Sequence, residues 1–231
     1  MRSVIVFLLI IAIGITYQKG WWEIPRQWVP WQPLHVDDPL TLVTQWKLKR
    51  LSDDRQACLA ALATTPENAL SYTPLADHSP VEACPLENVV RVHSTSVSFN
   101  QSFIASCPLA LAWVMFERHH LQPTAERLFD TRVSRVEHAG SFACRNVYGR
   151  ETGRRSEHAT AEALDVTGCR LDQGQHITLL RDWNETGEKG EYLQQLRDDA
   201  CTTFGNVLGP EYNAAHADHF HLGMRGYRLC R

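Results

Sequence analysis

Residues 211–224 read EYNAAHADHFHLGM, and the centre of this stretch holds three histidines, His216, His219 and His221. If its second half forms a β-strand, His219 and His221 project from the same face, about 6.5–7 Å apart along the chain. Imidazole is a common zinc ligand, but a catalytic zinc takes three protein ligands and leaves a fourth position open. Two histidines on one strand face therefore need a further ligand from elsewhere in the chain.

A second stretch, SEHATAEALD at residues 156–165, supplies such ligands in His158 and Asp165. Together with one of the C-terminal histidines they would form a His₂Asp site for one zinc ion, Zn²⁺, which would polarise a carbonyl oxygen and acidify water. Each stretch also has a simpler interpretation. The upstream one fits an exposed helix face with an i, i+4, i+8 pattern, and the histidine-rich one fits a solvated turn. Both simpler interpretations are weaker when the two stretches are considered together.

The two motifs, Ser-Glu-His-Ala-x-x-x-Ala-Leu-Asp and His-x-Asp-His-Phe-His, resemble those of the zinc peptidases grouped with lysostaphin, D-alanyl-D-alanine peptidases and the hedgehog amino-terminal domain. More closely, the chain resembles the bacterial extensin-like C-terminal domain family over roughly residues 35–231. Further matching segments are SFACRNVYGR at 141–150, LGPEYNAAH at 208–216 and the terminal Cys230-Arg231. The chemistry of plant-wall extensins does not follow from that name.

The resemblance implies roles for individual side chains. It assigns the metal to three ligands: His158, Asp165 and His221. It assigns catalysis to three further residues: His219 as general base or transition-state stabiliser, His216 as an additional active-site histidine, and Arg145 as the group that steadies the developing oxyanion.

Ser156 and Asp218 are the residues expected to contact substrate. Ser156 matches a substrate-binding serine of the D-alanyl-D-alanine branch. A rival alignment with a D-x-x-H motif makes Asp218 the base, with His221 as the ligand. Strand alternation disfavours this alignment, but a bend after His216 would permit it.

These features predict an exported zinc metallopeptidase, a hydrolase that cleaves peptide bonds in peptidoglycan as an endopeptidase or a carboxypeptidase. One alternative is a zinc-containing but catalytically silent module that binds cell wall or a protein. Another is a purely structural disulfide domain in which the three predicted ligands never meet. Other zinc and hydrolase motifs are missing from the sequence, including H-E-x-x-H, P-C-x-x-C and G-x-S-x-G.

The N-terminus predicts entry into a membrane. Arg2 precedes twelve apolar residues, 4–15, and four tryptophans follow closely, a residue type that favours the membrane interface: Trp21, Trp22, Trp28 and Trp31. The predicted organisation is a membrane anchor or signal segment at 1–20, a Trp/Pro-rich linker at 21–39 and an extensin-like zinc-peptidase-like domain at 40–231. The expected location is the bacterial inner membrane facing the periplasm, or the periplasm itself if the segment is cleaved.

Cysteine usage agrees with export, because the seven cysteines are widely spaced and no C-x-x-C pair occurs. Disulfide bonds are therefore expected, and Cys169, which lies in an apolar strand-like run, is the predicted free thiol. The formal charge of −3 gives no basic stripe, so nucleic acid is not an expected partner. The expected partners are peptidoglycan or its peptides, together with the membrane, and the oligomeric state stays open.

Hydrophobic periodicity completes the expected fold, an α+β domain with a small antiparallel sheet that carries the zinc site, flanked by helices, and an N-terminal membrane segment. The strands are expected in four segments: 88–104, 132–136, 141–145 and 174–180. The helices are expected at 107–120, 124–129 and 190–204, with one or two shorter ones between 40 and 65.

Overall fold

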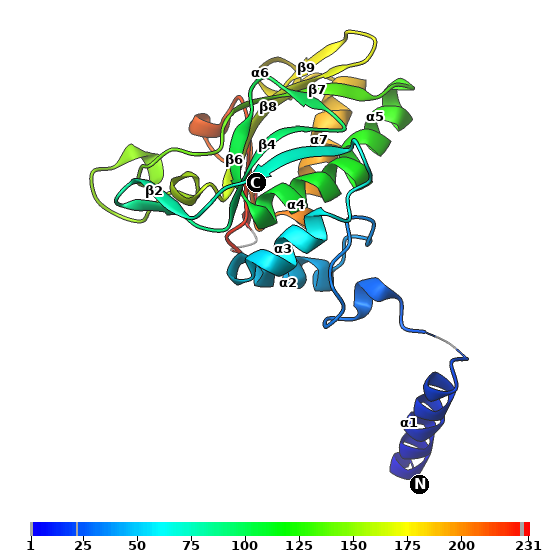
Figure 1. The fold of residues 1–231 in the computed structure, drawn as a ribbon. Coiled ribbons are helices and arrows are strands. Elements are labelled where there is room, and N and C mark those ends of the chain that lie inside the picture. Colours follow the sequence, from blue (N-terminus) through cyan, green and yellow to red (C-terminus); the bar gives the residue numbers. More distant parts are fainter. Residues whose placement is uncertain (1, 22, 227–228) are drawn as a thin grey trace.

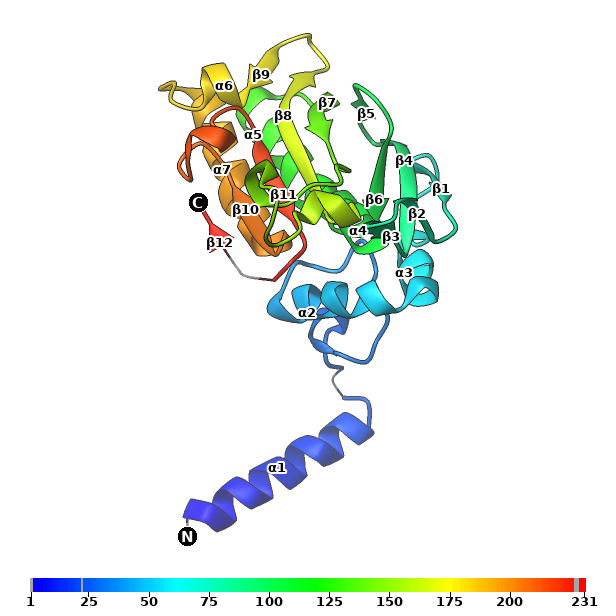
Figure 2. The same cartoon turned by 90° about the vertical axis from the view of Figure 1, so that its left-hand side faces the viewer.

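The computed structural model describes residues 2–21, 23–226 and 229–231. Two main sheets and a group of helices form the body of the molecule, and α1 (Arg2–Gln18) extends away from that body in both views (Figure 1, Figure 2). The other α-helices are α2 (Leu42–Arg50), α3 (Arg55–Leu62), α4 (Cys107–Phe116), α5 (Gln122–Phe129), α6 (Leu179–Asp182) and α7 (Glu188–Thr203). The short 3₁₀ or π turns are η1 (Arg26–Trp28), η2 (Leu51–Asp53), η3 (Glu117–Leu121), η4 (Val147–Gly149), η5 (Glu157–Thr160) and η6 (Ala214–His216).

The larger sheet has the strand order β12-β10-β11-β8-β7-β5, with β9 paired to β8. Its strands are β5 (Ser98–Phe99), β7 (Val133–Gly140), β8 (Ala163–Leu171), β9 (His176–Thr178), β10 (Asn206–Leu208), β11 (Phe220–Gly223) and β12 (Leu229–Cys230). A second sheet pairs β1 (Leu70–Pro74), β4 (Val89–Thr95) and β6 (Phe103–Ser106), and β2 (His78–Val81) pairs with β3 (Cys84–Leu86).

Helix α4 forms the centre of the core, because every one of its residues is buried. Its N-terminus is capped by Ser106, whose hydroxyl accepts a hydrogen bond from the amide of Leu109, and Pro108 occupies the first turn, where no amide donor is needed. A helix that is apolar on all sides is stable only when other elements surround it. α4 accordingly packs against α3, α7 and the strands β4 and β6.

The pairing of β8 with β11 places the candidate site on one face of the larger sheet. The two strands are antiparallel, and His221 lies opposite Asp165. Their neighbours in the strands point to the other face and join the main core: Leu164, Val166, Phe220 and Leu222. Strand alternation thus separates an apolar face from a face that carries the two polar side chains.

The α+β class agrees with this architecture, but two parts of the predicted fold class are wrong. No helix in the described ranges is both long and apolar enough to cross a membrane, so the predicted N-terminal membrane segment is not supported. α1 has 17 residues, a length of about 25 Å against the roughly 30 Å of a bilayer core. Trp22, one of the tryptophans expected at a membrane interface, lies outside the described residues.

The expectation of a small antiparallel sheet is the second error. In the described part of the chain the larger sheet has seven strands, and its outer pairs β10–β12 and β5–β7 are parallel. The strand expected at 141–145 is irregular, because its backbone pairs with the loop around His158 and not with the sheet.

The expectation of disulfide bonds is confirmed. Three disulfides connect described residues: Cys58–Cys107, Cys84–Cys144 and Cys201–Cys230. Cys169 is buried and free, as predicted.

Candidate metal centre

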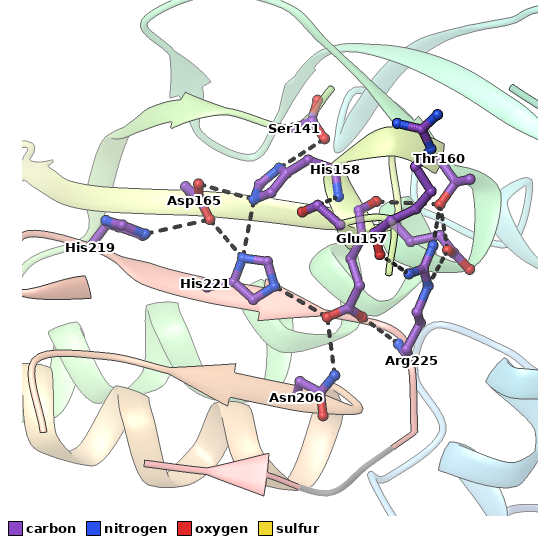
Figure 3. A network of polar contacts seen from close by, with 12 residues as sticks. Ser141, Glu157, His158, Thr160, Asp165, Asn206, His219, His221 and Arg225 are labelled. Carbon is purple, nitrogen blue, oxygen red and sulfur yellow. Dashed lines mark hydrogen bonds and ion pairs between the residues drawn. The ribbon is translucent and has the colours of Figure 1, made fainter. Parts of the chain in front are cut away.

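Three polar side chains from two distant parts of the chain meet at one point (Figure 3). His158 Nε2 lies 3.1 Å from an oxygen of Asp165, and His221 Nδ1 lies 3.0 Å from the other oxygen. The two ring nitrogens are 3.1 Å apart. The structure therefore brings together the three residues to which the family resemblance assigns the metal.

Local structure explains how His158 reaches the sheet. The hydroxyl of Ser156 caps η5 by accepting a hydrogen bond from the amide of His158, and the short turn ends at Ala161, whose φ of 53° lies in the left-handed region. This reversal carries the chain directly into β8, where Asp165 follows. The helical interpretation of 157–165 does not hold, since only residues 157–160 are helical and β8 begins at Ala163.

The outer nitrogen of each imidazole has its own acceptor. His158 Nδ1 lies 3.1 Å from the carbonyl oxygen of Ser141, and His221 Nε2 lies 3.2 Å from a carboxylate oxygen of Glu157. A neutral imidazole has one proton, and these acceptors place it on the outer nitrogens. The inner nitrogens and Asp165 then present only lone pairs to one another, an arrangement that needs a cation between them.

A zinc ion fits this donor set. Ligands about 2.0–2.2 Å from a tetrahedral ion lie about 3.3–3.6 Å from one another, and the donors are already 3.0–3.1 Å apart. Two imidazole nitrogens and one carboxylate oxygen form a common set for zinc, and outer partners like those of both histidines accompany most metal-binding imidazoles.

The charges at this centre stabilise one another. Burial alone would raise the pKa of Asp165, but hydrogen bonds with His158 and His221 outweigh burial and hold that pKa far below its ordinary value. Burial alone would lower the pKa of His221, but Asp165 and Glu157 outweigh it and raise the pKa to about 9. Burial of Glu157 is likewise outweighed, mainly by hydrogen bonds from His221 and the Arg225 amide, so its pKa lies below the usual value. Without a metal, the proton on His221 supplies the required cation.

His219 lies beside the donor set but outside it. Its Nε2 is 3.7 Å from the nearer oxygen of Asp165, and its Nδ1 is 2.8 Å from a carboxylate oxygen of Asp218. The strand begins only at Phe220, and the turn after η6 supplies the bend that lets Asp218 reach this histidine. Asp218 itself has a side chain that is 60% exposed. It therefore contacts the far nitrogen of His219 rather than the donor set.

His216 packs against His219 beside the donor set. Its Nδ1 lies 2.8 Å from Asn213 Oδ1, and its ring lies against that of His219 at a centroid distance of 5.2 Å. Burial, together with the neighbouring His219 and His221, lowers the pKa of His216 to about 4. The side chain is therefore a neutral imidazole at physiological pH.

The remaining predicted residues come from a hairpin at residues 145–156. An isolated antiparallel bridge joins Asn146 to Arg155, with backbone hydrogen bonds on either side. Because side chains alternate across such a pairing, one side of the hairpin faces the site. That side carries Arg145, Val147, Arg154 and Ser156.

The hairpin and the sheet border an open cavity of about 520 Å³. All the predicted site residues except Asp218 line it: Arg145, Ser156, His158, Asp165, His216, His219 and His221. Tyr148 and Tyr212 add an aromatic wall, and their hydroxyls lie 3.4 Å apart. Asn213 donates to the hydroxyl of Tyr148, so the network that holds His216 also fixes this wall.

Sequence reasoning missed Glu157, Asn206 and the two tyrosines. Glu157 stands next to His158 in the quoted motif, but a helical pattern places it on a solvated face. In the structure it is 7% exposed and accepts a hydrogen bond from Asn206 Nδ2 at 3.0 Å. No local signal marks Asn206, which lies in a separate strand.

The family described as "Extensin-like protein C-terminus" matches residues 56–231. No curated protein and no solved structure matches the chain.

Proposed function

Since this chain belongs to the family of extensin-like protein C-termini and carries a His-Asp-His donor set in an open cavity, we propose that it is a zinc-dependent peptidase. Its proposed substrates are peptide bonds of peptidoglycan, cleaved as an endopeptidase or a carboxypeptidase. The observation that carries the proposal is the position of His219, which flanks the donor set without belonging to it. A site made of metal ligands alone is consistent with a structural metal, whereas a general base next to the ligands is consistent with a hydrolytic enzyme.

His158, Asp165 and His221 would hold the zinc ion, leaving the cavity side open to substrate. Zinc bound there would act as a Lewis acid toward water and a carbonyl oxygen. His158 and Asp165 are seven residues apart, and His219 and His221 are two residues apart. These spacings resemble those of zinc peptidases of the lysostaphin and D-alanyl-D-alanine type and support a relationship to them.

The other side chains supply proton transfer and orientation. His219 accepts a proton from water at Nε2 and returns it to the leaving amine, while Asp218 holds the proton on Nδ1. Arg145 and Ser156 face the cavity from the hairpin, where they would orient the substrate carbonyl and stabilise the developing oxyanion. His216, neutral beside His219, lines the same wall without adding charge.

The disulfides support an oxidising, exported location, because such bonds persist mainly outside the cytosol. We place the protein in the bacterial periplasm, where peptidoglycan is the abundant peptide-containing polymer.

Metal analysis of the purified chain, followed by digestion of isolated murein and mass spectrometry of the released fragments, tests this function. We expect about one zinc per chain and product from the native protein. His219→Ala should keep zinc and lose product, and His93→Ala, an exposed histidine on β4, serves as the control. Zinc without product on any murein would favour a binding module, and a chain that binds no zinc would contradict both functions.

A further inference from the structure

Glu157 is a buried carboxylate that the proposed reaction does not use. One of its oxygens lies 3.2 Å from His221 Nε2 and accepts a hydrogen bond from Asn206 Nδ2 at 3.0 Å. The other accepts from the backbone amide of Arg225 at 2.7 Å. Figure 3 shows the carboxylate beside the His221 ring, on the side opposite to Asp165.

The hydrogen bonding requires an ionised carboxylate. Within the described part of the chain, three N–H donors converge on its two oxygens. A carboxylate accepts all three, whereas a carboxamide has one acceptor oxygen and directs its own N–H groups at one of the donors. Glutamine therefore cannot reproduce this set of contacts, although it has nearly the same shape.

The backbone is adapted to this close approach. A Cβ atom added to Gly223, two residues after His221, would lie 2.6 Å from both carboxylate oxygens of Glu157. Any other residue at this position would displace the carboxylate. The contact between the carboxylate and β11 thus depends on the glycine.

A purely structural ion pair does not account for Glu157. The guanidinium of Arg225 binds Glu162 at 2.9 Å, Thr160 at 3.0 Å and the carbonyl of Arg155 at 2.9 Å, so only its backbone amide meets Glu157. The charged partner of Glu157 in this network is the imidazole of His221.

We propose that Glu157 is a positioning residue that keeps a proton on His221 Nε2 and thereby directs the lone pair of Nδ1 toward a divalent cation. This inference rests on the proposed zinc site. Carboxylates that accept a hydrogen bond from a metal-binding imidazole fix its orientation and increase its basicity, and their loss weakens metal binding about 10–100-fold.

The matched comparison is Glu157→Gln against Glu162→Gln. Glu162 belongs to the same network through Arg225 but makes no contact with His221. Zinc affinity, measured by competition with a chromophoric chelator, should fall about 10–100-fold in the first variant and stay within about threefold of the native value in the second. Equal losses in both, or native affinity in Glu157→Gln, would overturn the inference.

A second measurement needs no zinc. In the metal-free protein, the ¹H–¹⁵N spectrum of histidine side chains should show the Nε2–H of His221 protected from exchange, and Glu157→Gln should lose that protection while Glu162→Gln keeps it. Unchanged protection in Glu157→Gln would contradict the proposed contact. This spectrum tests Glu157 even if the native chain binds no zinc and the proposed function fails.

If Glu157→Gln does not fold, the shorter carboxylates Glu157→Asp and Glu162→Asp provide the same comparison. Aspartate keeps the charge and fits the space but withdraws the oxygens from His221 by about one bond length. Zinc affinity should then fall in the first variant alone, and an equal affinity in the two would count against the inference.

Discussion

Asp218 contacts the nitrogen of His219 that faces away from the donor set, and this geometry separates two mechanisms. If Asp218 only orients His219, Asp218→Ala should lower kcat about 10-fold, because its exposed carboxylate is screened by water. His219→Ala, which removes the proposed base, should lower kcat about 10²–10⁴-fold. Steady-state kinetics at saturating zinc make the comparison. An equal or larger loss in Asp218→Ala would support the rival alignment, in which Asp218 is the base.

The raised pKa of His221 predicts how stability changes with pH. Its folded-state pKa of about 9 exceeds the ordinary 6.5, so the protonated form stabilises the metal-free fold fully below pH 6.5, and this contribution is lost as pH rises toward 9. The difference corresponds to at most about 3 kcal/mol. Urea unfolding at pH 6.5 and pH 9 should show the loss with chelator present but not with stoichiometric zinc, which would replace the proton. A similar loss with zinc would argue against metal binding at His221.

Residue spacing identified the candidate ligands because each of the two motifs lies within a short stretch of sequence. His158 and Asp165 flank a short reversal, and His221 lies on a strand, so both patterns are local. Glu157 could not be found in the same way. Its role depends on His221 and Asn206, which lie far along the chain, and helical periodicity alone places it in solvent.

At the level of elements, the 145–156 hairpin predicts recognition of negatively charged peptides. Arg145 and Arg154 line the cavity side of the hairpin. Arg155, which pairs with Asn146 in the bridge, directly follows Arg154, so side-chain alternation places it on the opposite face of the hairpin. Arg154→Ala should raise KM about 10-fold for peptides with a free carboxylate near the cleaved bond, since a hydrogen bond to a charged group contributes about 1.5–3 kcal/mol. Arg155→Ala is the matched control and should change KM less than about twofold. Similar effects of both substitutions would contradict this assignment.

Periodicity predicted the helices around α4 and α7 and the strands from 88 to 104, because each has a continuous apolar pattern. It failed at 141–145, where Ala143 donates to the carbonyl of His158 instead of to a neighbouring strand. It also missed the parallel edge pairs, since the direction of pairing depends on chain connections and not on local pattern.

At the scale of the whole molecule, two of the disulfides should contribute similarly to stability but differently to the proposed activity. Cys58–Cys107 joins α3 to α4 inside the core, whereas Cys84–Cys144 ties the β2–β3 hairpin to the residue before Arg145. They close loops of similar length, with sequence separations of 49 and 60 residues. The entropic effect of the two crosslinks on the unfolded chain is therefore nearly the same.

Replacing either pair with serines should therefore lower the free energy of unfolding by a similar amount, about 2–4 kcal/mol, measured by urea denaturation. Kinetics should distinguish the two variants. Loss of Cys84–Cys144 releases the hairpin that carries Arg145 and Ser156, so KM should rise while zinc affinity stays native, because the ligands lie on η5, β8 and β11. Loss of Cys58–Cys107 should leave both quantities unchanged at temperatures where the protein stays folded. If KM rose equally in both variants, the hairpin would not be positioned by its disulfide, and substrate binding would depend on overall stability instead.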